Sequence, residues 1–294
     1  MTLVSIIVPC FNYGATLDET MRSALEQDHS EIEVILVDDG STDALTLDRV
    51  AFWQEQAAHD HRIKVIQQEN RGLSAARNAG IASSLGDYFL PLDSDDLIDP
   101  RYCRLAAEVL DNNQDIGIVY CRAELFGDQS GEWPLPEFSM DAILVENCIF
   151  ATSLFRRADW ARAGGYDQAM HAGLEDHDFN LKVLSLGRRV HRIDEVLFFY
   201  RRHSGSMARA LSEGAARDKL IASYAQLFRN NSNLYLANAE AFWRGHFACI
   251  DERNWAAWQR DKLMQRYRHL ERLRETRLVR KIKGILHAWR SRNP

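Results

Sequence analysis

The stretch 87-DYFLPLDSDD-96 joins a short apolar run to a cluster of carboxylates, and three earlier apolar runs likewise end in polar or turn-forming loops. Asp87–Leu92 is predicted to be a strand. Leu3–Val8, Ile32–Val37 and Ile63–Ile66 are similar short runs rich in β-branched residues, which is typical of strands buried on both faces. Helical patterns separate these strands. Strands alternating with helices predict an α/β fold with a mostly parallel central sheet. The helical stretches lie near Leu17–Glu26, Leu45–Ala58 and Leu73–Ser84.

Each of the four predicted strands ends in a polar or turn-forming loop. In a parallel sheet, ligands bind beyond the carboxyl ends of the strands, so these loops are expected to form one site. The loops are Pro9–Asn12, Asp38–Asp43, Gln68–Gly72 and Asp93–Asp96.

The alternation of strands and helices is less regular after Pro100. We expect helices at Arg101–Leu110 and Glu175–Leu186, strands at Ile116–Tyr120, Asn147–Phe155 and Val196–Tyr200, and a loop at Gly127–Pro136. From about Glu213 onward the sequence is helical. We therefore expect three parts: residues 1–100 with the regular pattern, residues 101–212 with the looser pattern, and a helical extension at 213–294.

The composition excludes several classes of protein. With 294 residues, 46% of them hydrophobic, the chain is long enough to bury a large core and too apolar to be disordered. It contains no run of about 20 apolar residues that would predict a membrane span. The N-terminal run lacks a basic region and a cleavage site, so we expect a strand rather than a signal peptide. The five cysteines form no C-x-x-C pair, which favours a reducing cytoplasm over a zinc site or disulfides.

The net charge of -6 is unevenly distributed. From Ala215 to the end there are 17 Lys and Arg against 7 Asp and Glu, so the preceding part of the chain is strongly acidic. Such a division suggests an acidic body that holds a metal and a phosphate-bearing ligand, and a basic tail that meets an anionic surface.

The acids of the DSDD turn are the first candidate site. Asp93 and Asp95 are two residues apart, so both carboxylates can face one cation in an extended turn. Mn²⁺ or Mg²⁺ prefers such oxygen ligands and often keeps phosphate oxygens in its shell. A cluster of N-cap residues before the next helix is the alternative explanation.

Two further loops carry charged groups. In 37-VDDGSTD-43, Asp39 can accept from a base N–H and Asp38 can support the loop, whereas a capped turn alone would need only Ser41 or Asp43. In 70-NRGLSAARNAG-80, Arg77 follows the third strand and can bind phosphate; the alternative is a surface arginine. No G-x-G-x-x-G or P-loop motif supports a Rossmann dinucleotide site or a P-loop.

The stretch 174-LEDHDFNLKVLSLG-187 places Glu175, Asp176 and Asp178 at the start of a helix. Acids there are also favoured by the helix dipole alone. A carboxylate beside other acids holds a proton more tightly, which suits a general base. His203, in 200-YRRHSGSM-207, can complete a metal shell or contact phosphate, although a lone histidine is more often structural.

In this order, the motifs resemble those of the family 2 glycosyltransferases with the GT-A fold. The resemblance implies a nucleotide-sugar donor, a divalent metal and inversion at the anomeric carbon. It also implies that 1–100 is the nucleotide-sugar-binding half of the GT-A domain and 101–212 its acceptor-binding and catalytic half. It places Asp95 as the main metal ligand, with Asp93 near the ribose and metal. It identifies Asp176 as the expected base with Glu175 beside it, and the choice between them stays open. The remaining residues that it implies for the nucleotide sugar or the metal are Pro9, Phe11, Asn12, Asp39, Arg77, Ser94 and His203.

The expected reaction is the transfer of one hexosyl or N-acetylhexosaminyl group from a UDP-sugar to a glycan or lipid-linked acceptor in cell-surface polysaccharide synthesis. Processive relatives carry Q-x-x-R-W and membrane spans, whereas this chain has only 226-QLFRN-230. A sugar nucleotidyltransferase would need a basic glycine-rich loop after the first strand. A non-catalytic scaffold or sensor would be expected to lack some of the acids.

The C-terminal tail is predicted to be an amphipathic helix. Its apolar residues from Trp255 to Trp289 recur at steps of mostly three to five, and basic residues including Arg260 and Lys262 are expected on the other face. Peripheral contact with an anionic membrane is one expectation. Docking on the body or on a second copy of the chain is the alternative. Nucleic acid is disfavoured by the acidic body. The apolar positions are Trp255, Trp258, Leu263, Tyr267, Leu270, Leu273, Leu278, Ile282, Ile285 and Trp289.

Overall fold

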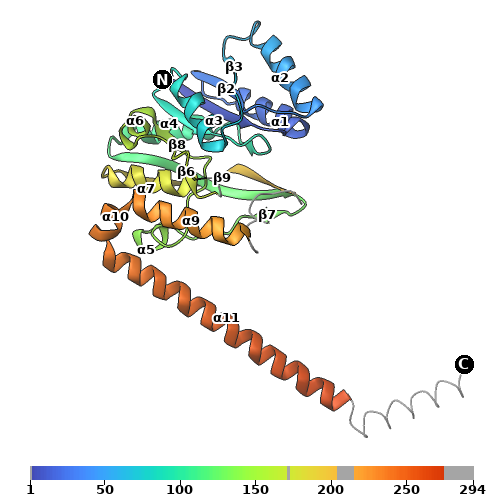
Figure 1. Ribbon diagram of the computed structural model, residues 1–294, viewed down its shortest axis with the longest axis vertical. Coiled ribbons are helices and arrows are strands. Elements are labelled where there is room, and N and C mark those ends of the chain that lie inside the picture. The colour runs from blue at the N-terminus through green and yellow to red at the C-terminus, as the bar shows by residue number, and fades with distance from the viewer. Residues whose placement is uncertain (1, 171–172, 204–214, 275–294) are drawn as a thin grey trace, which may run out of the picture. The chain divides into compact units, whose positions relative to one another are not determined.

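The computed structural model describes residues 2–170, 173–203 and 215–274, in which the chain forms an α/β fold around one sheet. The strand order within these residues is β3-β2-β1-β4-β8-β6-β9-β5, and β7 pairs with β6 (Figure 1). The chain divides into two compact units, Met1–Phe242 and Trp243–Pro294. The strands are β1 (Val4–Cys10), β2 (Ile32–Asp38), β3 (Ile63–Gln67), β4 (Tyr88–Pro91), β5 (Leu97–Ile98), β6 (Ile116–Gly127), β7 (Gly131–Glu132), β8 (Leu154–Arg156) and β9 (Arg189–Arg202).

The first half of the sheet is parallel, as the sequence predicts. β1 lies between β2 and β4, and β3 lies outside β2. Every residue of β1 is buried, which explains its continuous apolar run. Gly80 packs so closely on Ile7 that a Cβ atom there would clash with its Cγ2 atom. The helices of this half are α1 (Gly14–Leu25), α2 (Ala44–Gln56) and α3 (Leu73–Ala82).

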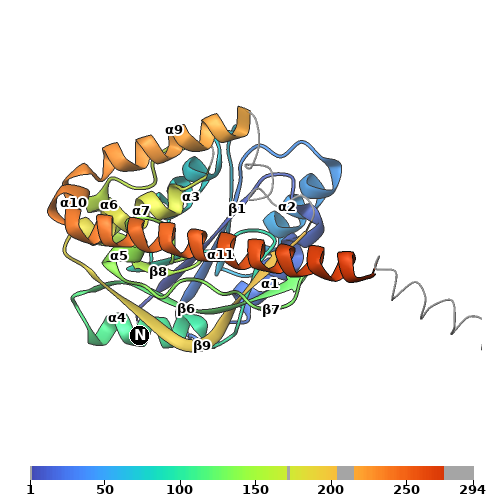
Figure 2. The same cartoon turned by 90° about the horizontal axis from the view of Figure 1, so that it is seen from below.

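The second half of the sheet is mixed. β8 is antiparallel to β4 and β6, and β6 is parallel to β9 along most of its length. Helices α3 and α7 lie on one side of the sheet and α4 on the other (Figure 2). The prediction of an α/β fold with helices around a central sheet is therefore confirmed. The helices of this half are α4 (Tyr102–Asn112), α5 (Met140–Ile143), α6 (Arg157–Ala163) and α7 (Glu175–Ser185).

The strand predicted at Asn147–Phe155 is wrong over most of its length, since only its end belongs to β8. The backbone before β8 is held by buried side chains instead of by a neighbouring strand. Asn180 donates to the Ile149 carbonyl at 3.1 Å, and Tyr102 donates to the Thr152 carbonyl at 2.8 Å. Such side-chain bonds satisfy buried carbonyls without a sheet ladder.

Helices α9 (Ala215–Asn230) and α10 (Ser232–Ala237) belong to the first unit and pack on α7. The buried carboxylate of Asp178 joins them, because it accepts from Asn230 Nδ2 at 3.0 Å and Asn231 Nδ2 at 2.8 Å. Lys182 Nζ lies 2.8 Å from the same carboxylate. Asp178 thus anchors α9 and α10 to α7.

Helix α11 (Ala239–Arg274) carries most of the described part of the second unit. Within the described residues, no helix is both long and apolar enough to cross a membrane. Trp255 and Trp258 are exposed and stack on each other at 4.9 Å. Lys262 Nζ lies 4.4 Å above the Trp258 ring, so the prediction that Lys262 lies on the opposite face is wrong.

The predicted apolar stripe is also less regular than expected. Leu263 is exposed, but it lies about 140° around the helix from Trp258, because each residue advances the helix by about 100°. The predicted positions Leu278, Ile282, Ile285 and Trp289 lie outside the described residues.

Candidate active site

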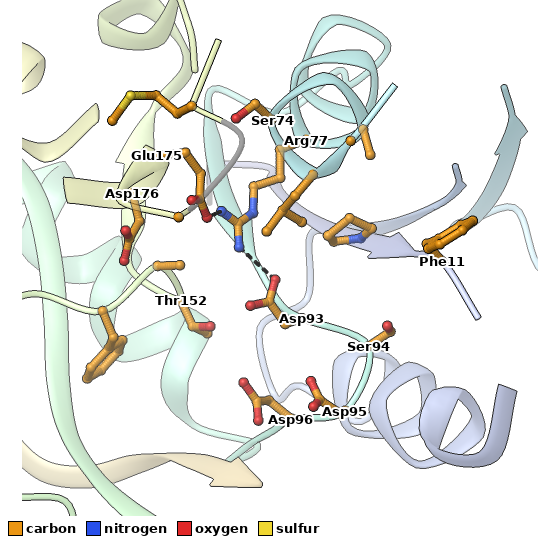
Figure 3. A pocket seen from close by; sticks show the side chains of 18 of the residues that line it. Phe11, Ser74, Arg77, Asp93, Ser94, Asp95, Asp96, Thr152, Glu175 and Asp176 are labelled. Carbon is orange, nitrogen blue, oxygen red and sulfur yellow. Dashed lines mark hydrogen bonds and ion pairs between the residues drawn. The ribbon is translucent and has the colours of Figure 1, made fainter. Parts of the chain in front are cut away.

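A pocket of about 680 Å³ opens at the carboxyl ends of the parallel strands. It brings together the loops that the sequence predicts, joined by residues of the second half of the first unit. Phe11 and Asp176 lie at opposite sides of the pocket, with Arg77 and Asp93 between them (Figure 3). Of the predicted site residues, the pocket is lined by Pro9, Phe11, Asp39, Arg77, Asp93, Ser94, Asp95, Glu175 and Asp176.

The acidic turn after β4 concentrates negative charge. Burial and the neighbouring Asp93 raise the pKa of Asp95, against the hydrogen bond that it makes with His203. Asp95 Oδ2 lies 3.1 Å from His203 Nε2. Burial, with the charges of Asp95 and Asp93, raises the pKa of Asp96 well above its usual range. Arg77 pairs with Asp93, and Arg201 opposes the rise in the pKa of Asp96, but the pKa of Asp95 and of Asp96 is still raised, so the turn is short of positive charge.

This shortage suits a bound cation. Asp95 and His203 offer oxygen and nitrogen ligands side by side, and a divalent ion would offset the repulsion between the acids. Within the described residues, no three His, Cys, Asp or Glu side chains are grouped to hold a metal ion. Mg²⁺ is commonly held by one or two carboxylates together with substrate phosphates, so phosphate oxygens and water would complete the shell. The residues thus fit a metal that arrives with a diphosphate.

Arg77 lies in the interior of α3 and not at its N-terminus, and its side chain is only 1% exposed. Its Nη2 donates to Asp93 Oδ1 at 2.7 Å, and its Nη1 donates to Glu175 Oε1 at 2.8 Å. Burial opposes its charge, but the Asp93 and Glu175 carboxylates outweigh this and raise the pKa of Arg77. The alternative of a surface arginine is therefore wrong.

Glu175 and Asp176 begin α7, after Leu174 in a left-handed conformation with φ of 71°. Burial raises the pKa of both carboxyl groups, and Arg77 opposes that shift. Glu175 is bound to the guanidinium. Asp176 Oδ2 accepts from Asn147 Nδ2 at 2.7 Å, and Oδ1 accepts from the His177 backbone at 2.8 Å. Among the described residues, Asp176 thus forms no direct ion pair, whereas Glu175 is paired with Arg77.

The opposite end of the pocket has the features of a nucleoside site. Phe11 is 42% exposed and lines the pocket, where its ring can stack on a base. Asp39 is buried and accepts from Gln68 Nε2 at 2.7 Å and from the backbone N–H of Arg71 and Gly72. Asp39 thus fixes the loop that precedes α3.

Two predicted residues lie outside the pocket lining. Asn12, with φ of 61°, accepts at Oδ1 from the backbone of Thr42 at 2.8 Å and of Asp43 at 3.2 Å, so it ties the first loop to the second. His203 reaches the site through Asp95. Asp43 caps α2 by accepting from the Thr46 backbone at 2.9 Å, as the sequence predicts.

Sequence reasoning missed several lining residues. Asp96 belongs to the quoted DSDD motif, and the sequence alone indicates no role for it. Tyr13 lies beside the acidic turn, and its ring contacts His203 edge-on at 6.1 Å. Trp133 and Asn147 come from a region that has no recognised motif, and Tyr200 begins the 200-YRRHSGSM-207 stretch, in which only His203 was expected at the site. An aromatic residue after a glycine-rich turn is the only signal that the sequence offers for Trp133.

The comparisons with known proteins agree with this geometry. The family model described as Glycosyl transferase family 2 matches residues 5–189. The chain belongs to this family and is a glycosyltransferase.

Several curated proteins are similar in sequence. An uncharacterized glycosyltransferase of Bacillus subtilis, EpsJ, is 30% identical over 242 residues, covering 76% of this chain and 67% of EpsJ. The glycosyltransferase GlyG of Streptococcus pneumoniae is 29% identical, covering 70% of this chain and 73% of GlyG. Chondroitin synthase of Escherichia coli is 28% identical, covering 63% of this chain but 27% of that enzyme.

Two solved structures show the same fold. S. aureus TarS in complex with UDP-GlcNAc has a TM-score of 0.66 at 21% identity, covering 84% of this chain and 73% of TarS. The mannosyltransferase PcManGT of Pyrobaculum calidifontis, in complex with GDP-Man and Mn²⁺, has a TM-score of 0.57 at 20% identity, covering 85% of this chain and 74% of PcManGT.

Proposed function

We propose that this glycosyltransferase transfers a single sugar from a nucleoside diphosphate sugar to a saccharide hydroxyl, with inversion. One observation carries the proposal: the pocket joins an acidic turn short of positive charge to a separate pair of carboxylates, with Arg77 between them. In a displacement reaction, the acidic turn would hold the leaving diphosphate, and the carboxylate pair would take the proton of the attacking hydroxyl. In this scheme residues 1–100 bind the donor and residues 101–212 bind the acceptor.

The proposed base is Asp176. Its carboxylate takes the proton of the acceptor hydroxyl as that oxygen bonds to the anomeric carbon and the bond from that carbon to the phosphate breaks. The nucleoside diphosphate leaves with the bonding electrons. The raised pKa of Asp176 suits proton abstraction. Attack from the face opposite the leaving group gives inversion, by analogy with two-carboxylate glycoside chemistry.

The proposed donor site runs from Phe11 to the acidic turn. Pro9 and Phe11 hold the nucleoside, Asp39 its base, and Asp93 and Ser94 the ribose and diphosphate. Asp95 and His203 would hold the divalent metal, which neutralises charge on the leaving diphosphate when bound. We propose uridine as the nucleoside; TarS, a structural neighbour, was solved with UDP-GlcNAc, whereas PcManGT was solved with GDP-Man.

The proposed product is a polysaccharide of the cell surface. Support comes from chondroitin synthase among the relatives. Single transfer is favoured because 226-QLFRN-230 lacks the tryptophan of the processive motif, and Gln226 and Asn230 bind the Asp167 carboxylate instead.

Hydrolysis of the donor tests the reaction without a known acceptor, because water can take the acceptor's place. UDP-glucose, UDP-galactose, UDP-GlcNAc and GDP-mannose would each be incubated with enzyme and Mn²⁺, and the released sugar followed by NMR before it mutarotates. We expect one donor to release its sugar first as the β anomer. First release of the α anomer would contradict inversion, and release of sugar without Mn²⁺ would contradict the requirement for a divalent metal.

We also propose peripheral contact with the cytoplasmic face of an anionic membrane through α11. Trp255 and Trp258 are 60% and 48% exposed, and the tail from Ala215 is strongly basic. Tryptophan beside basic residues is typical of helices that lie at a membrane interface.

Co-sedimentation with vesicles of phosphatidylglycerol and phosphatidylcholine tests the membrane contact. The full chain should sediment with anionic vesicles, and the variant Trp255→Ala/Trp258→Ala should sediment less. The matched control replaces two exposed apolar residues of α9, Ile221→Ala/Phe228→Ala, and should sediment like the original chain. Equal sedimentation of the tryptophan variant, or of a chain ending near Glu252, would contradict the contact.

A further inference from the structure

An aromatic cluster forms one wall of the pocket. Trp133 stacks on Tyr200 with ring centroids 4.5 Å apart and planes 21° apart. Phe150 and Phe198 pack behind them, 4.6 Å from each other, and both are almost fully buried. Trp133 and Tyr200 are only half-buried, and all four residues line the pocket. Two buried rings thus support two rings that the pocket can reach.

The aromatic wall also contains a hydrogen-bond donor, the indole N–H of Trp133. The backbone N–H of Trp133 is fixed to the Ala123 carbonyl at 2.9 Å, but its indole Nε1 has no hydrogen-bond partner among the described residues. A tryptophan N–H near a binding surface normally finds a partner, which leaves this one available to a ligand.

The wall is connected to the proposed base. Phe150, which stacks on Trp133 at 6.1 Å, lies three residues after Asn147. Asn147 donates to Asp176 at 2.7 Å. The same loop therefore carries an aromatic face and an amide that holds the carboxylate. This places a flat apolar surface next to the loop residue that holds Asp176, and Asp176 lies across the pocket from Phe11 (Figure 3).

A pyranose ring has matching chemistry. Its axial C–H groups form an apolar face with a slight positive charge, which is attracted to the negative face of an aromatic ring. Its hydroxyl groups need donors and acceptors at the rim of that face. A hydrocarbon chain would fill an apolar wall equally well, but it would leave the indole N–H of Trp133 without a partner, whereas Asn147 is already bonded to Asp176 and to the Ile149 backbone.

We propose that Trp133 and Tyr200 form the acceptor subsite, where one pyranose ring packs on the wall with a hydroxyl directed to Asp176. The inference rests on the proposed function and adds the residues that select a sugar as acceptor. Trp133 contacts the acceptor and not the donor. Its loss therefore weakens acceptor binding while donor binding stays unchanged.

Ligand-observed saturation-transfer NMR tests this without the natural acceptor. The probes are the methyl α- and β-glycosides of glucose, galactose, mannose and N-acetylglucosamine, each with enzyme, UDP and Mn²⁺. At least one glycoside should receive saturation at its ring protons. In Trp133→Ala, its Kd should be about tenfold weaker, and Trp133→Phe should lie between. Trp243→Ala, which changes an exposed tryptophan of the second unit, should bind like the original chain.

The outcomes separate this inference from the proposed function. UDP binding in the presence of Mn²⁺ is measured on each variant, and it should be equal in all of them. If UDP binds but no glycoside does, or if Trp133→Ala binds the glycoside normally, the acceptor subsite is wrong and the donor site stands. If Trp133→Ala weakens the UDP-sugar and leaves UDP binding intact, the wall holds the donor sugar instead. Failure of UDP itself would contradict the proposed function.

Discussion

Arg77 and Glu175, 98 residues apart in the chain, meet inside the pocket with Nη1 and Oε1 separated by 2.8 Å. The other arm of the same guanidinium binds Asp93 at 2.7 Å. One buried cation therefore links α3, the acidic turn and the start of α7. Because the link spans both halves of the first unit, it fixes the distance between the proposed metal site and the proposed base.

Removing the cation should destabilise the fold. Arg77→Met leaves Glu175 buried without its partner, and breaking a buried ion pair costs about 3–5 kcal/mol. The loss should shrink at low pH, because protonation of the carboxylates removes the uncompensated charge. Urea denaturation at two pH values measures this. Arg71→Met, at an exposed position of the preceding loop, is the matched control. A loss that is equal at both pH values would contradict the charge argument.

The two acids of α7 should differ in function. Asp176→Asn should lower kcat for donor turnover by about 10²–10⁴, since it removes the proposed base, while UDP binding with Mn²⁺ stays intact. Glu175→Gln should instead lower stability, because it weakens the bond to Arg77. Kinetics and thermal denaturation of both variants distinguish the catalytic role of Asp176 from the structural role of Glu175. A stable Glu175→Gln without activity, beside an active Asp176→Asn, would reverse the assignment.

The pH profile should respond to Asn147. Burial raises the pKa of Asp176, so the acid limb of kcat should lie above the pKa of an ordinary aspartate. The bond from Asn147 stabilises the charged form and lowers this pKa. Asn147→Ala removes that bond, so the acid limb should move to higher pH. If the acid limb of the kcat profile stays at the same pH or moves to lower pH, Asp176 does not determine it.

The parallel half of the fold was predictable because β1, β2 and β4 are short runs buried on both faces, and because a helix follows each of β1, β2 and β3. The expectation that β3 is buried on both faces is wrong, since this edge strand has exposed residues. Helix ends are equally local signals: Asp43 caps the start of α2, and Gly187 follows the end of α7. The region from Asn147 to Thr152 was not predictable. Its backbone is satisfied by Asn180 and Tyr102, which are distant in the sequence, and an apolar run alone cannot reveal such partners.

The candidate site, like the fold, was predictable only in part. The acids were found because they follow strands whose ends must meet in a parallel sheet. The sequence did not reveal that Arg77 is buried between two of them, since periodicity does not show which charges will pair. Asp178 looked like part of the acid cluster, but its carboxylate binds Asn230 and Asn231.

The anchor at Asp178 should contribute to stability and not to chemistry. Asn231→Ala removes a buried bond of 2.8 Å to this carboxylate and should cost about 1–3 kcal/mol. Asn238→Ala, which loses only a bond to the Leu234 carbonyl, should cost less. Urea denaturation compares the two. UDP binding by folded Asn231→Ala should be unchanged, and a large loss of affinity would contradict a purely structural role.

The central claim is that the acidic turn binds a nucleoside diphosphate through a divalent metal, and thermal denaturation with UDP, GDP, dTDP and CMP, each with and without Mn²⁺, tests it most directly. A ligand that binds only the folded state raises the melting temperature according to its affinity. We expect UDP to raise the Tm only when Mn²⁺ is present, and Asp95→Ala to abolish that rise. A UDP shift independent of Mn²⁺, a shift that survives in Asp95→Ala, or no shift with any nucleotide would contradict the claim.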